Sequence, residues 1–194
     1  MSTREEQREK RRGQILSAGL SLFIRKGYAA TRISDIAERV GMSTGLLFHY
    51  FPSKEKLYEE LIAIGVNTPM AVMAPTEMEP LAFFVHTTEE ILFYIRSQPF
   101  TAEMFVLMAQ AYCYEAAVPP SIRDTLRHFD VYTPTAALLQ KGQESGTIRS
   151  GDPYALAIAY WCAIQGIAEQ IALWPQTPCP ESEWIVDIIR RKDT

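Results

Sequence analysis

The feature that most constrains this chain is a helical hydrophobic pattern interrupted by a glycine, within residues 31–57. Apolar residues recur every three or four positions from Ile33 to Val40, which is the spacing of a helix with one buried face. Gly41 follows where that helix must end, because glycine accepts the left-handed backbone that other residues resist. Ser43 can then cap a second helix, roughly Thr44 to Tyr50. The pattern predicts a helix-turn-helix, whose second helix would enter a DNA major groove.

A proline ends this second helix and a lysine opens the next one. Pro52 forces Phe51 out of helical geometry, and Ser53 restarts a helix with Lys54 in its first turn. A helix N-terminus that bears a lysine is suited to bind phosphate. We therefore expect Lys54 to contact the DNA backbone.

The whole run resembles the N-terminal domain of the TetR family of bacterial transcriptional regulators, whose pattern is T…dIA…GvS.gtlY.YF.sKe.L. The resemblance is specific over about residues 10–60, and this sequence departs from the pattern where Leu46 replaces threonine and Phe48 replaces tyrosine. The two missing hydroxyls put one phosphate contact and one base contact in doubt. The matching positions are Thr31, Asp35, Ile36, Ala37, Gly41, Ser43, Gly45, Leu47, Tyr50, Phe51, Ser53, Lys54, Glu55 and Leu57.

The expected contacts with DNA gather in and around the second helix. In the resembled family the positions of Thr31 and Arg32 are frequent phosphate contacts, and Thr31 is also expected to cap the first helix of the motif. Phosphate contacts position a protein on the duplex, whereas base contacts select the sequence. The predicted DNA-binding residues are Thr31, Arg32, Ser43, Thr44, Gly45, Leu46, Phe48, His49, Tyr50 and Lys54.

A competing motif lies inside the same stretch. Residues 41–45 fit G-x-S-x-G, the nucleophile elbow of α/β-hydrolases, which needs a buried strand directly before its serine. The residues before Ser43 have a helical period and several charges instead. Ser43 is therefore interpreted as a helix cap.

The charge is distributed unevenly along the chain, although its net value of −4 is unusual for a protein that binds DNA. Residues 1–60 carry 11 Lys and Arg against 8 Asp and Glu, a net charge of +3. Residues 61–194 carry 8 against 15, a net charge of −7. A basic excess on the helix-turn-helix side is typical of nucleic-acid binding.

The rest of the chain repeats the helical period and nowhere alternates with the period of a strand. We expect an all-α fold of about nine helices, with an N-terminal three-helix head in a DNA-binding domain of residues 1–52. A C-terminal helical bundle of residues 53–194 would bind a ligand and dimerise. Besides the two helices of the motif, the expected helices are 10–27, 53–66 with a break or kink near Pro69, 81–98, 100–117, 121–144 either straight or bent near Pro134, 153–174 and 182–191.

Aromatic and methionine side chains are frequent between residues 81 and 132. Such residues suit an adaptable cavity, although a simple helical core is an equally good interpretation for any one of them. Arg96 is the only Lys or Arg between Leu57 and Ile122, so a strongly anionic ligand is not expected there. His86 and His128 suit hydrogen-bonded structural roles. The resemblance implies a ligand pocket in this domain, and the residues predicted for it are Phe83, His86, Met104, Met108, Tyr112, Phe129 and Trp161.

Small residues form a stripe along the helix that begins at Asp152, and small side chains let two helices approach closely. In the resembled family the last two long helices form a four-helix bundle between two subunits. Packing within one chain is the alternative explanation of the stripe. The residues predicted for the dimer interface are Ala155, Ala159, Cys162, Ala163, Gly166, Trp184, Ile185 and Ile188.

The sequence offers no nucleophile–base set, carboxylate pair, phosphate loop or metal-ligand spacing, so we expect no enzyme, cofactor or metal. The three cysteines suit buried thiols in a reducing cytoplasm, and the uncharged stretches 61–76 and 153–168 do not favour a membrane span. We expect a cytoplasmic homodimeric repressor that binds duplex operator DNA and a small apolar, neutral or cationic ligand. The alternatives are an activator or architectural protein without a ligand, and a helical ligand-binding or catalytic protein whose helix-turn-helix is only structural.

Overall fold

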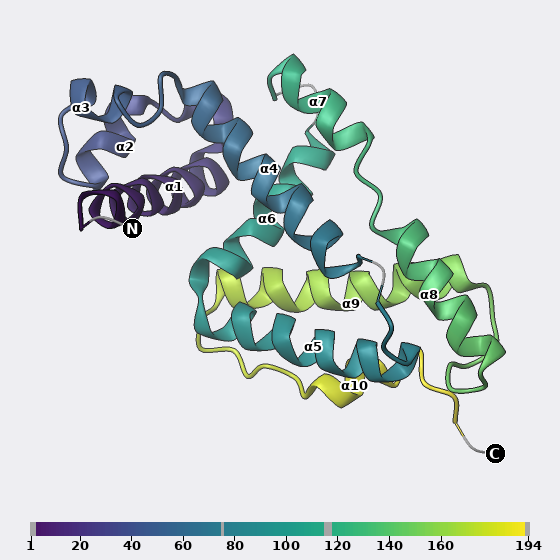
Figure 1. Ribbon diagram of the computed structural model, residues 1–194. Coiled ribbons are helices and arrows are strands. Elements are labelled where there is room, and N and C mark those ends of the chain that lie inside the picture. Colours follow the sequence, from purple (N-terminus) through teal and green to yellow (C-terminus); the bar gives the residue numbers. More distant parts are fainter. Residues whose placement is uncertain (1–2, 75, 115–117, 193–194) are drawn as a thin grey trace. The chain divides into compact units, whose positions relative to one another are not determined.

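The computed structural model describes residues 3–74, 76–114 and 118–192. The other residues of the two expected domains lie outside this description. Among them are the last three residues of the expected helix 100–117. The described residues form ten helices and one isolated antiparallel bridge, which confirms the expected all-α class (Figure 1). The helices are α1 (Thr3–Ala30), α2 (Ile33–Arg39), α3 (Thr44–Phe48), α4 (Lys54–Val72), α5 (Pro80–Ser97), α6 (Pro99–Cys113), α7 (Pro120–Arg127), α8 (Tyr132–Glu144), α9 (Pro153–Leu173) and α10 (Ser182–Val186).

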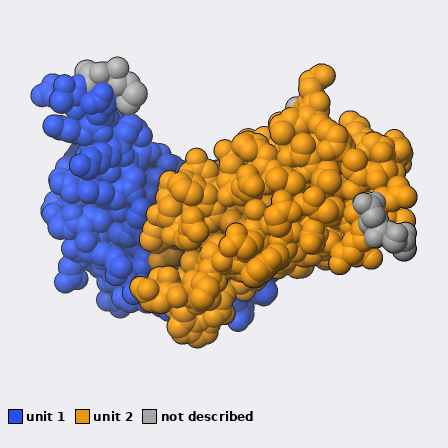
Figure 2. Space-filling model, turned by 90° about the horizontal axis from the view of Figure 1, so that it is seen from below, with its two compact units in different colours: residues 1–66, 106–128 blue, residues 67–105, 129–194 orange. Residues whose placement is uncertain are grey.

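The described chain divides into two compact units (Figure 2). Unit 1 combines residues 1–66 and 106–128, and unit 2 combines residues 67–105 and 129–194. Helices α4 and α6 each begin in one unit and end in the other. Unit 1 is thus larger than the head expected from the helix-turn-helix alone. The functional boundary between residues 52 and 53 stays a prediction.

Unit 1 is held together by the buried face of α1 against the helices that follow. The Cβ that Gly19 lacks would lie 2.6 Å from a methyl of Leu57, so this glycine lets α1 and α4 approach closely. Phe23 and Tyr58 meet edge to face, with ring centroids 4.9 Å apart. Gly27 has φ 79° and interrupts the α1 helix at the residue where the sequence predicted its end.

Three helix predictions were wrong. The expected helix 121–144 is two helices, because the Asp130 carboxylate accepts hydrogen bonds from the backbone N–H groups of Tyr132 and Thr133 and starts α8 there. Helix α4 does not break at Pro69 but continues to Val72. The expected final helix 182–191 ends at Val186, because the segment after it pairs with residues 147–149 instead.

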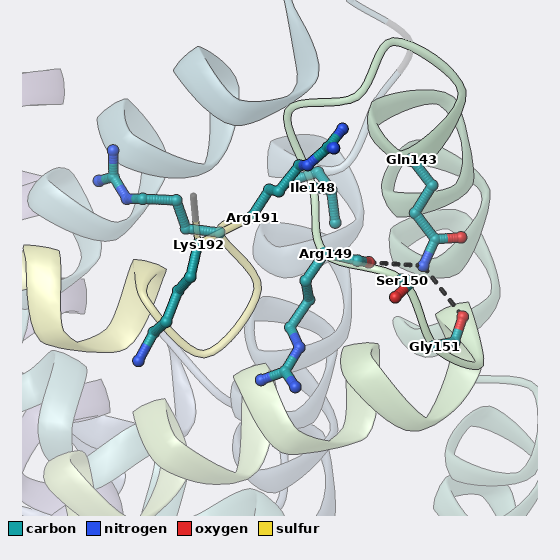
Figure 3. Close-up of a pocket in the computed structure, with 8 residues that line it drawn as sticks. Gln143, Ile148, Arg149, Ser150, Gly151, Arg191 and Lys192 are labelled. Carbon is teal, nitrogen blue, oxygen red and sulfur yellow. Dashed lines mark hydrogen bonds between the residues drawn. The ribbon is translucent and has the colours of Figure 1, made fainter. Parts of the chain in front are cut away.

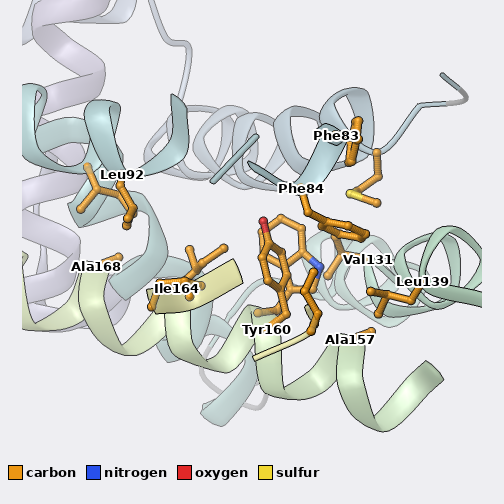
Figure 4. Packing of buried hydrophobic residues seen from close by; sticks show 14 of the residues in the cluster. Phe83, Phe84, Leu92, Val131, Leu139, Ala157, Tyr160, Ile164 and Ala168 are labelled. Atoms are coloured by element: carbon orange, nitrogen blue, oxygen red, sulfur yellow. The ribbon is translucent and has the colours of Figure 1, made fainter. Parts of the chain in front are cut away.

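The core of unit 2 includes Tyr160 of α9, which Figure 4 shows among the buried side chains, and its neighbour Trp161. The Tyr160 hydroxyl lies 2.8 Å from the hydroxyl of Thr88, which also donates to the Phe84 carbonyl. The Trp161 indole N–H donates to the Thr135 hydroxyl at 2.9 Å. Thr135 and Thr88 are both fully buried. Since buried polar groups must be hydrogen-bonded to be tolerated, these pairs fix the rotation of α9 in the core.

The free energy of unfolding is expected to fall in alkaline solution, and to fall less in the Tyr160→Phe variant than in the wild type. Burial raises the pKa of Tyr160 to about 12, so between about pH 10 and 12 the unfolded chain releases this proton and the folded chain retains it. Stability is therefore complete below pH 10 and falls as the pH rises through this window, by roughly 2 kcal/mol. Urea unfolding at pH 8 and pH 11 measures this. Tyr58, whose pKa is also raised to about 12, titrates in both proteins and cancels in the comparison.

At pH 8 the same substitution is expected to cost about 1 kcal/mol, because Thr88 loses a hydrogen-bond partner. An equal loss of stability between pH 8 and pH 11 in the two proteins would contradict the assignment of the alkaline effect to Tyr160.

Candidate nucleic-acid interface

The turn between α2 and α3 has the geometry that the sequence predicted. Gly41 has φ 64°, its N–H donates to the Glu38 carbonyl, and the Met42 N–H donates to the Ala37 carbonyl at 2.9 Å. These two bonds form a Schellman motif, which satisfies carbonyls at the end of α2. The Ser43 hydroxyl caps α3 by accepting the Leu46 N–H at 3.2 Å. The end of α2 and the start of α3 are therefore both capped by hydrogen bonds within the helix-turn-helix.

Helix α3 buries one side chain and presents the others. Leu47 is fully buried and packs α3 into unit 1. Leu46 and Phe48, the two departures from the resembled pattern, are 47% and 45% exposed. The other predicted contacts in this region that are exposed are Ser43, Thr44, Gly45 and His49. A short helix thus offers a mixed apolar and polar surface of the kind that reads base edges.

Thr31 has a different role from the one predicted. Its side chain is 1% exposed, and its hydroxyl donates to the Gly27 carbonyl at 2.8 Å. The N-cap of α2 is Arg32, which has no side-chain cap bond, so the expected cap by Thr31 was wrong. The hydroxyl of Thr31 instead donates to carbonyls of α1, those of Gly27 and Leu22. Arg32 is exposed, as a phosphate contact requires.

Lys54 is turned toward its own unit. Its ammonium group donates to the carbonyls of Tyr28 at 2.7 Å and Thr31 at 2.9 Å, and more weakly to Ala29. It also lies 4.3 Å from the centre of the Tyr28 ring. Burial lowers the pKa of Lys54. These contacts use the donors of the ammonium group to hold the segment before α2, which is a structural function that the sequence pattern did not predict.

Lys54→Met is expected to lower the free energy of unfolding by about 1.5–3 kcal/mol, because charge-assisted hydrogen bonds to three carbonyls are lost. Lys56→Met is the matched control, since Lys56 is exposed and pairs only with Glu59 among the described residues, three positions along α4. Chemical denaturation of both variants is the measurement. If Lys54→Met were as stable as Lys56→Met and lowered the salt slope of DNA binding by about one unit, the predicted phosphate contact would stand.

Arg12 is a positioning residue whose role the sequence did not reveal. Its guanidinium forms an ion pair with Glu60, donates to the Tyr50 carbonyl at 3.3 Å and lies 4.5 Å from the centre of the Phe51 ring. It thereby ties α1 to the end of the recognition segment and to α4. Tyr50 itself is partly buried.

Known proteins share this region. Residues 15–61 match the model of the bacterial regulatory proteins of the tetR family. Residues 15–61 of the chain therefore have the sequence of a TetR-family DNA-binding domain. The HTH-type transcriptional repressor KstR2 of Mycobacterium tuberculosis is 40% identical over 52 residues, which are 27% of this chain and 26% of that protein. The matched stretch thus spans about a quarter of that relative.

Longer matches cover most of the chain at lower identity. The HTH-type transcriptional regulator RutR of Escherichia coli K12 is 29% identical over 160 residues, 80% of this chain and 72% of that protein. The solved structure of KstR2 has a TM-score of 0.70 at 19% identity and covers 94% of this chain and 96% of that one. A transcriptional regulator from Saccharomonospora viridis, solved in complex with choline, has a TM-score of 0.63 at 22% identity and covers 95% and 100%. These structures establish the TetR fold, and the named relatives are regulators.

The residues predicted for a ligand pocket are dispersed over both units. Phe83 and Trp161 are packed in the core of unit 2, with the buried Met104 and partly buried Phe129 in the same unit. Met108 and Tyr112 belong to unit 1, where the Tyr112 hydroxyl donates to the Leu126 carbonyl. His86 is exposed, and its Nε2 lies 3.6 Å from the carboxylate of Glu90 one turn along α5. His128 is also exposed.

The residues predicted for a TetR-type dimer interface divide by exposure. Ala155, Ala159, Cys162 and Gly166 are exposed along one side of α9, and Trp184 is exposed on α10. Ala163 and Ile188 are partly buried, whereas Ile185 is buried in the core of its own chain, so its prediction was wrong. Cys113 and Cys162 are exposed rather than buried as expected. The exposed side of α9 also carries large apolar residues that the small-residue stripe did not reveal: Tyr154, Ile158 and Leu173, followed by Trp174.

Helix α9 is long and apolar enough to cross a membrane by length and composition, with a mean hydropathy of 1.3, contrary to the expectation for this stretch. Only 33% of its most apolar window is buried within the described structure. A core helix of a globular protein passes the same test of composition. What distinguishes α9 is therefore an apolar side that no element of the described part of the chain covers.

Proposed function

We propose that this protein is a homodimeric transcriptional regulator that binds duplex operator DNA through α3, represses transcription there and is released by a small molecule. The observation that carries the proposal is the surface of α3, where Leu46, Phe48 and His49 are exposed on a helix-turn-helix that is otherwise complete. The basic excess of residues 1–60 supports it. A protein with this activity acts in the cytoplasm, needs no membrane and is not an enzyme.

Salt-dependent binding to duplex DNA tests this proposal. The full chain would first select duplexes from genomic fragments, and its affinity for a selected duplex would be compared with that for a scrambled one between 50 and 200 mM salt. We expect the selected duplex to bind about a thousandfold more tightly or better, with log K falling linearly against log salt. Absence of DNA binding would favour the alternative in which the helix-turn-helix is only structural. A reporter gene placed behind the selected duplex then distinguishes repression from activation.

Leu46 and Phe48 are expected to read thymine methyl groups. Apolar side chains in the major groove contact the C5-methyl of thymine, which deoxyuridine lacks. Replacing a contacted thymidine by deoxyuridine should weaken binding by about fourfold, the equivalent of roughly 0.8 kcal/mol for one buried methyl. In the Leu46→Ala variant, the same replacement at the thymidine that Leu46 contacts should no longer weaken binding. The same replacement outside the footprint is the control, and an undiminished penalty in Leu46→Ala would contradict the assignment.

A second copy of the chain is the partner that we propose for the exposed side of α9. The apolar residues on that side exceed what a helix of a monomer normally leaves uncovered, and the TetR fold supports a helix from another subunit as the cover. Two-fold symmetry would place the two recognition helices roughly 34–36 Å apart, on successive turns of a near-palindromic operator.

The ligand that we propose is apolar and neutral or cationic. Arg96 is the only Lys or Arg between Leu57 and Ile122, which disfavours an anion there, and the Saccharomonospora viridis regulator was solved with choline, a cation. Because Phe83 and Trp161 are packed in the core, a ligand that contacts these two side chains must bind a rearranged form of unit 2. Reciprocity supplies the test, since the operator must weaken ligand binding by the same factor, about 5–150-fold, as the ligand weakens operator binding. Titration with choline, with and without operator, measures both; equal choline affinity in the two titrations would exclude choline as the effector.

A further inference from the structure

A basic hollow of about 810 Å³ lies in unit 2, and none of the predicted ligand residues lines it (Figure 3). It is formed by the end of α8, the loop that follows Ile148 and the segment that ends the described chain. Its lining residues are Gln143, Ile148, Arg149, Ser150, Gly151, Arg190, Arg191 and Lys192. None of them belongs to the DNA-binding, ligand or dimer residues discussed above.

The frame of this hollow is fixed by backbone hydrogen bonds between segments far apart in the sequence. The Arg149 N–H donates to the Ile189 carbonyl at 2.9 Å, and the Arg191 N–H donates to the Thr147 carbonyl at 3.1 Å. The Gln143 amide donates to the carbonyls of Arg149 and Gly151, which holds the loop on the end of α8 (Figure 3). The backbone that carries Arg149 and Arg191 is therefore braced.

The charge of the hollow is opposite to that of its surroundings. Residues 61–194 carry eight Lys and Arg and a net charge of −7, yet four of the eight line this one hollow. Arg190 is neutralised by ion pairs with Glu183 and Asp187, and Arg191 donates to the Gly146 carbonyl. The Asp152 carboxylate, next in sequence to the loop, accepts the Ala155 N–H as the cap of α9.

Two cations of the hollow have neither a carboxylate partner nor a side-chain hydrogen bond among the described residues. Within the described ranges no ion pair or side-chain hydrogen bond engages the charged groups of Arg149 or Lys192. Figure 3 shows both side chains extending toward the same side of the hollow, whereas Arg191 points the other way. Like charges held on one side repel each other, and an anion between them would relieve that repulsion. The fork of an arginine and the point charge of a lysine are together suited to phosphate oxygens.

We propose that this hollow binds a small molecule carrying a phosphate or pyrophosphate group, held by Arg149 and Lys192 with the Ser150 hydroxyl beside them. A volume of 810 Å³ is in the range of small-molecule sites and exceeds what a single phosphate fills, so the group would be part of a larger metabolite. The site is separate from the proposed apolar ligand and does not depend on DNA binding.

Calorimetric titration of the full chain with inorganic pyrophosphate, at constant ionic strength, tests the proposal. Wild type should bind one pyrophosphate per chain, and Arg149→Gln with Lys192→Gln should weaken this binding at least tenfold, because two charge-assisted contacts are lost. Lys141→Gln is the control for charge, since Lys141 is exposed on α8 and does not line the hollow. It should leave the affinity within about twofold.

Circular dichroism melting establishes that the variants are folded. No binding to wild type, or an equal loss of affinity in Lys141→Gln, would overturn the proposal. A loss of duplex DNA affinity in the double variant together with failure to bind pyrophosphate would assign the hollow to the DNA backbone and overturn it as well.

Discussion

Gly166→Arg is expected to convert the protein to a monomer and to abolish its specific operator binding. Gly166 is exposed on α9 at the end of the small-residue stripe, and a Cβ built on it meets no atom within 4 Å outside its own stretch of helix. Arginine therefore fits the chain itself without strain, while in a dimer its charge would be buried in an apolar interface with no partner. Because a palindromic operator is bound by both heads together, a monomer retains only single half-site affinity.

Sedimentation velocity and operator titration measure the two effects of Gly166→Arg. We expect the sedimenting mass to halve and the affinity for the operator to fall by at least a hundredfold, the scale on which linking two binding modules acts. Ser97→Arg introduces the same side chain at an exposed position of α5 and should leave both quantities unchanged. A Gly166→Arg protein that remains dimeric would place the interface elsewhere on the chain.

The features that the sequence predicted correctly depend on neighbours within a few residues. Gly41 ends α2 because of its own backbone angle, and Ser43 caps α3 through an N–H three positions away. Such local hydrogen bonds leave a recognisable spacing in the sequence. The helix-turn-helix, and with it the surface of α3, could therefore be placed without a structure.

The features that the sequence did not predict depend on distant partners. Lys54 bonds carbonyls more than twenty positions earlier, and Arg12 bonds the Tyr50 carbonyl 38 positions later. Lys54 lies at the start of a helix, and Arg12 lies in a polar, basic stretch of another helix. Basic residues that contact DNA phosphates occur in the same local patterns, so the sequence alone does not distinguish the two roles. Similarly, the period of residues 184–189 continues as a helix would, but pairing with Ile148 and its neighbours ends α10 early.

Gly142→Val is expected to destabilise unit 2 strongly, although valine is an acceptable residue in a helix. A Cβ at Gly142 would lie 2.2 Å from Cγ1 of Ile148 and 3.1 Å from Cβ of Pro80, so α8 cannot accept a side chain there without displacing its neighbours. Overpacking of this kind costs typically 1–3 kcal/mol, and a contact this short places the expected loss at about 3 kcal/mol or more. Urea denaturation measures it.

A second substitution separates the clash from a general effect of valine in α8. Ile148→Ala alone should lose about 2–5 kcal/mol, because Ile148 is buried at the bridge that braces the basic hollow. It also removes Cγ1, the atom that Gly142→Val would strike, so the double variant should lose less than the two single variants together, by about 1–3 kcal/mol. Strict additivity would mean that Gly142 is needed for another reason than its contact with Ile148. A coupling of the expected sign would show that this glycine exists to let the loop after α8 close against the chain's last described residues.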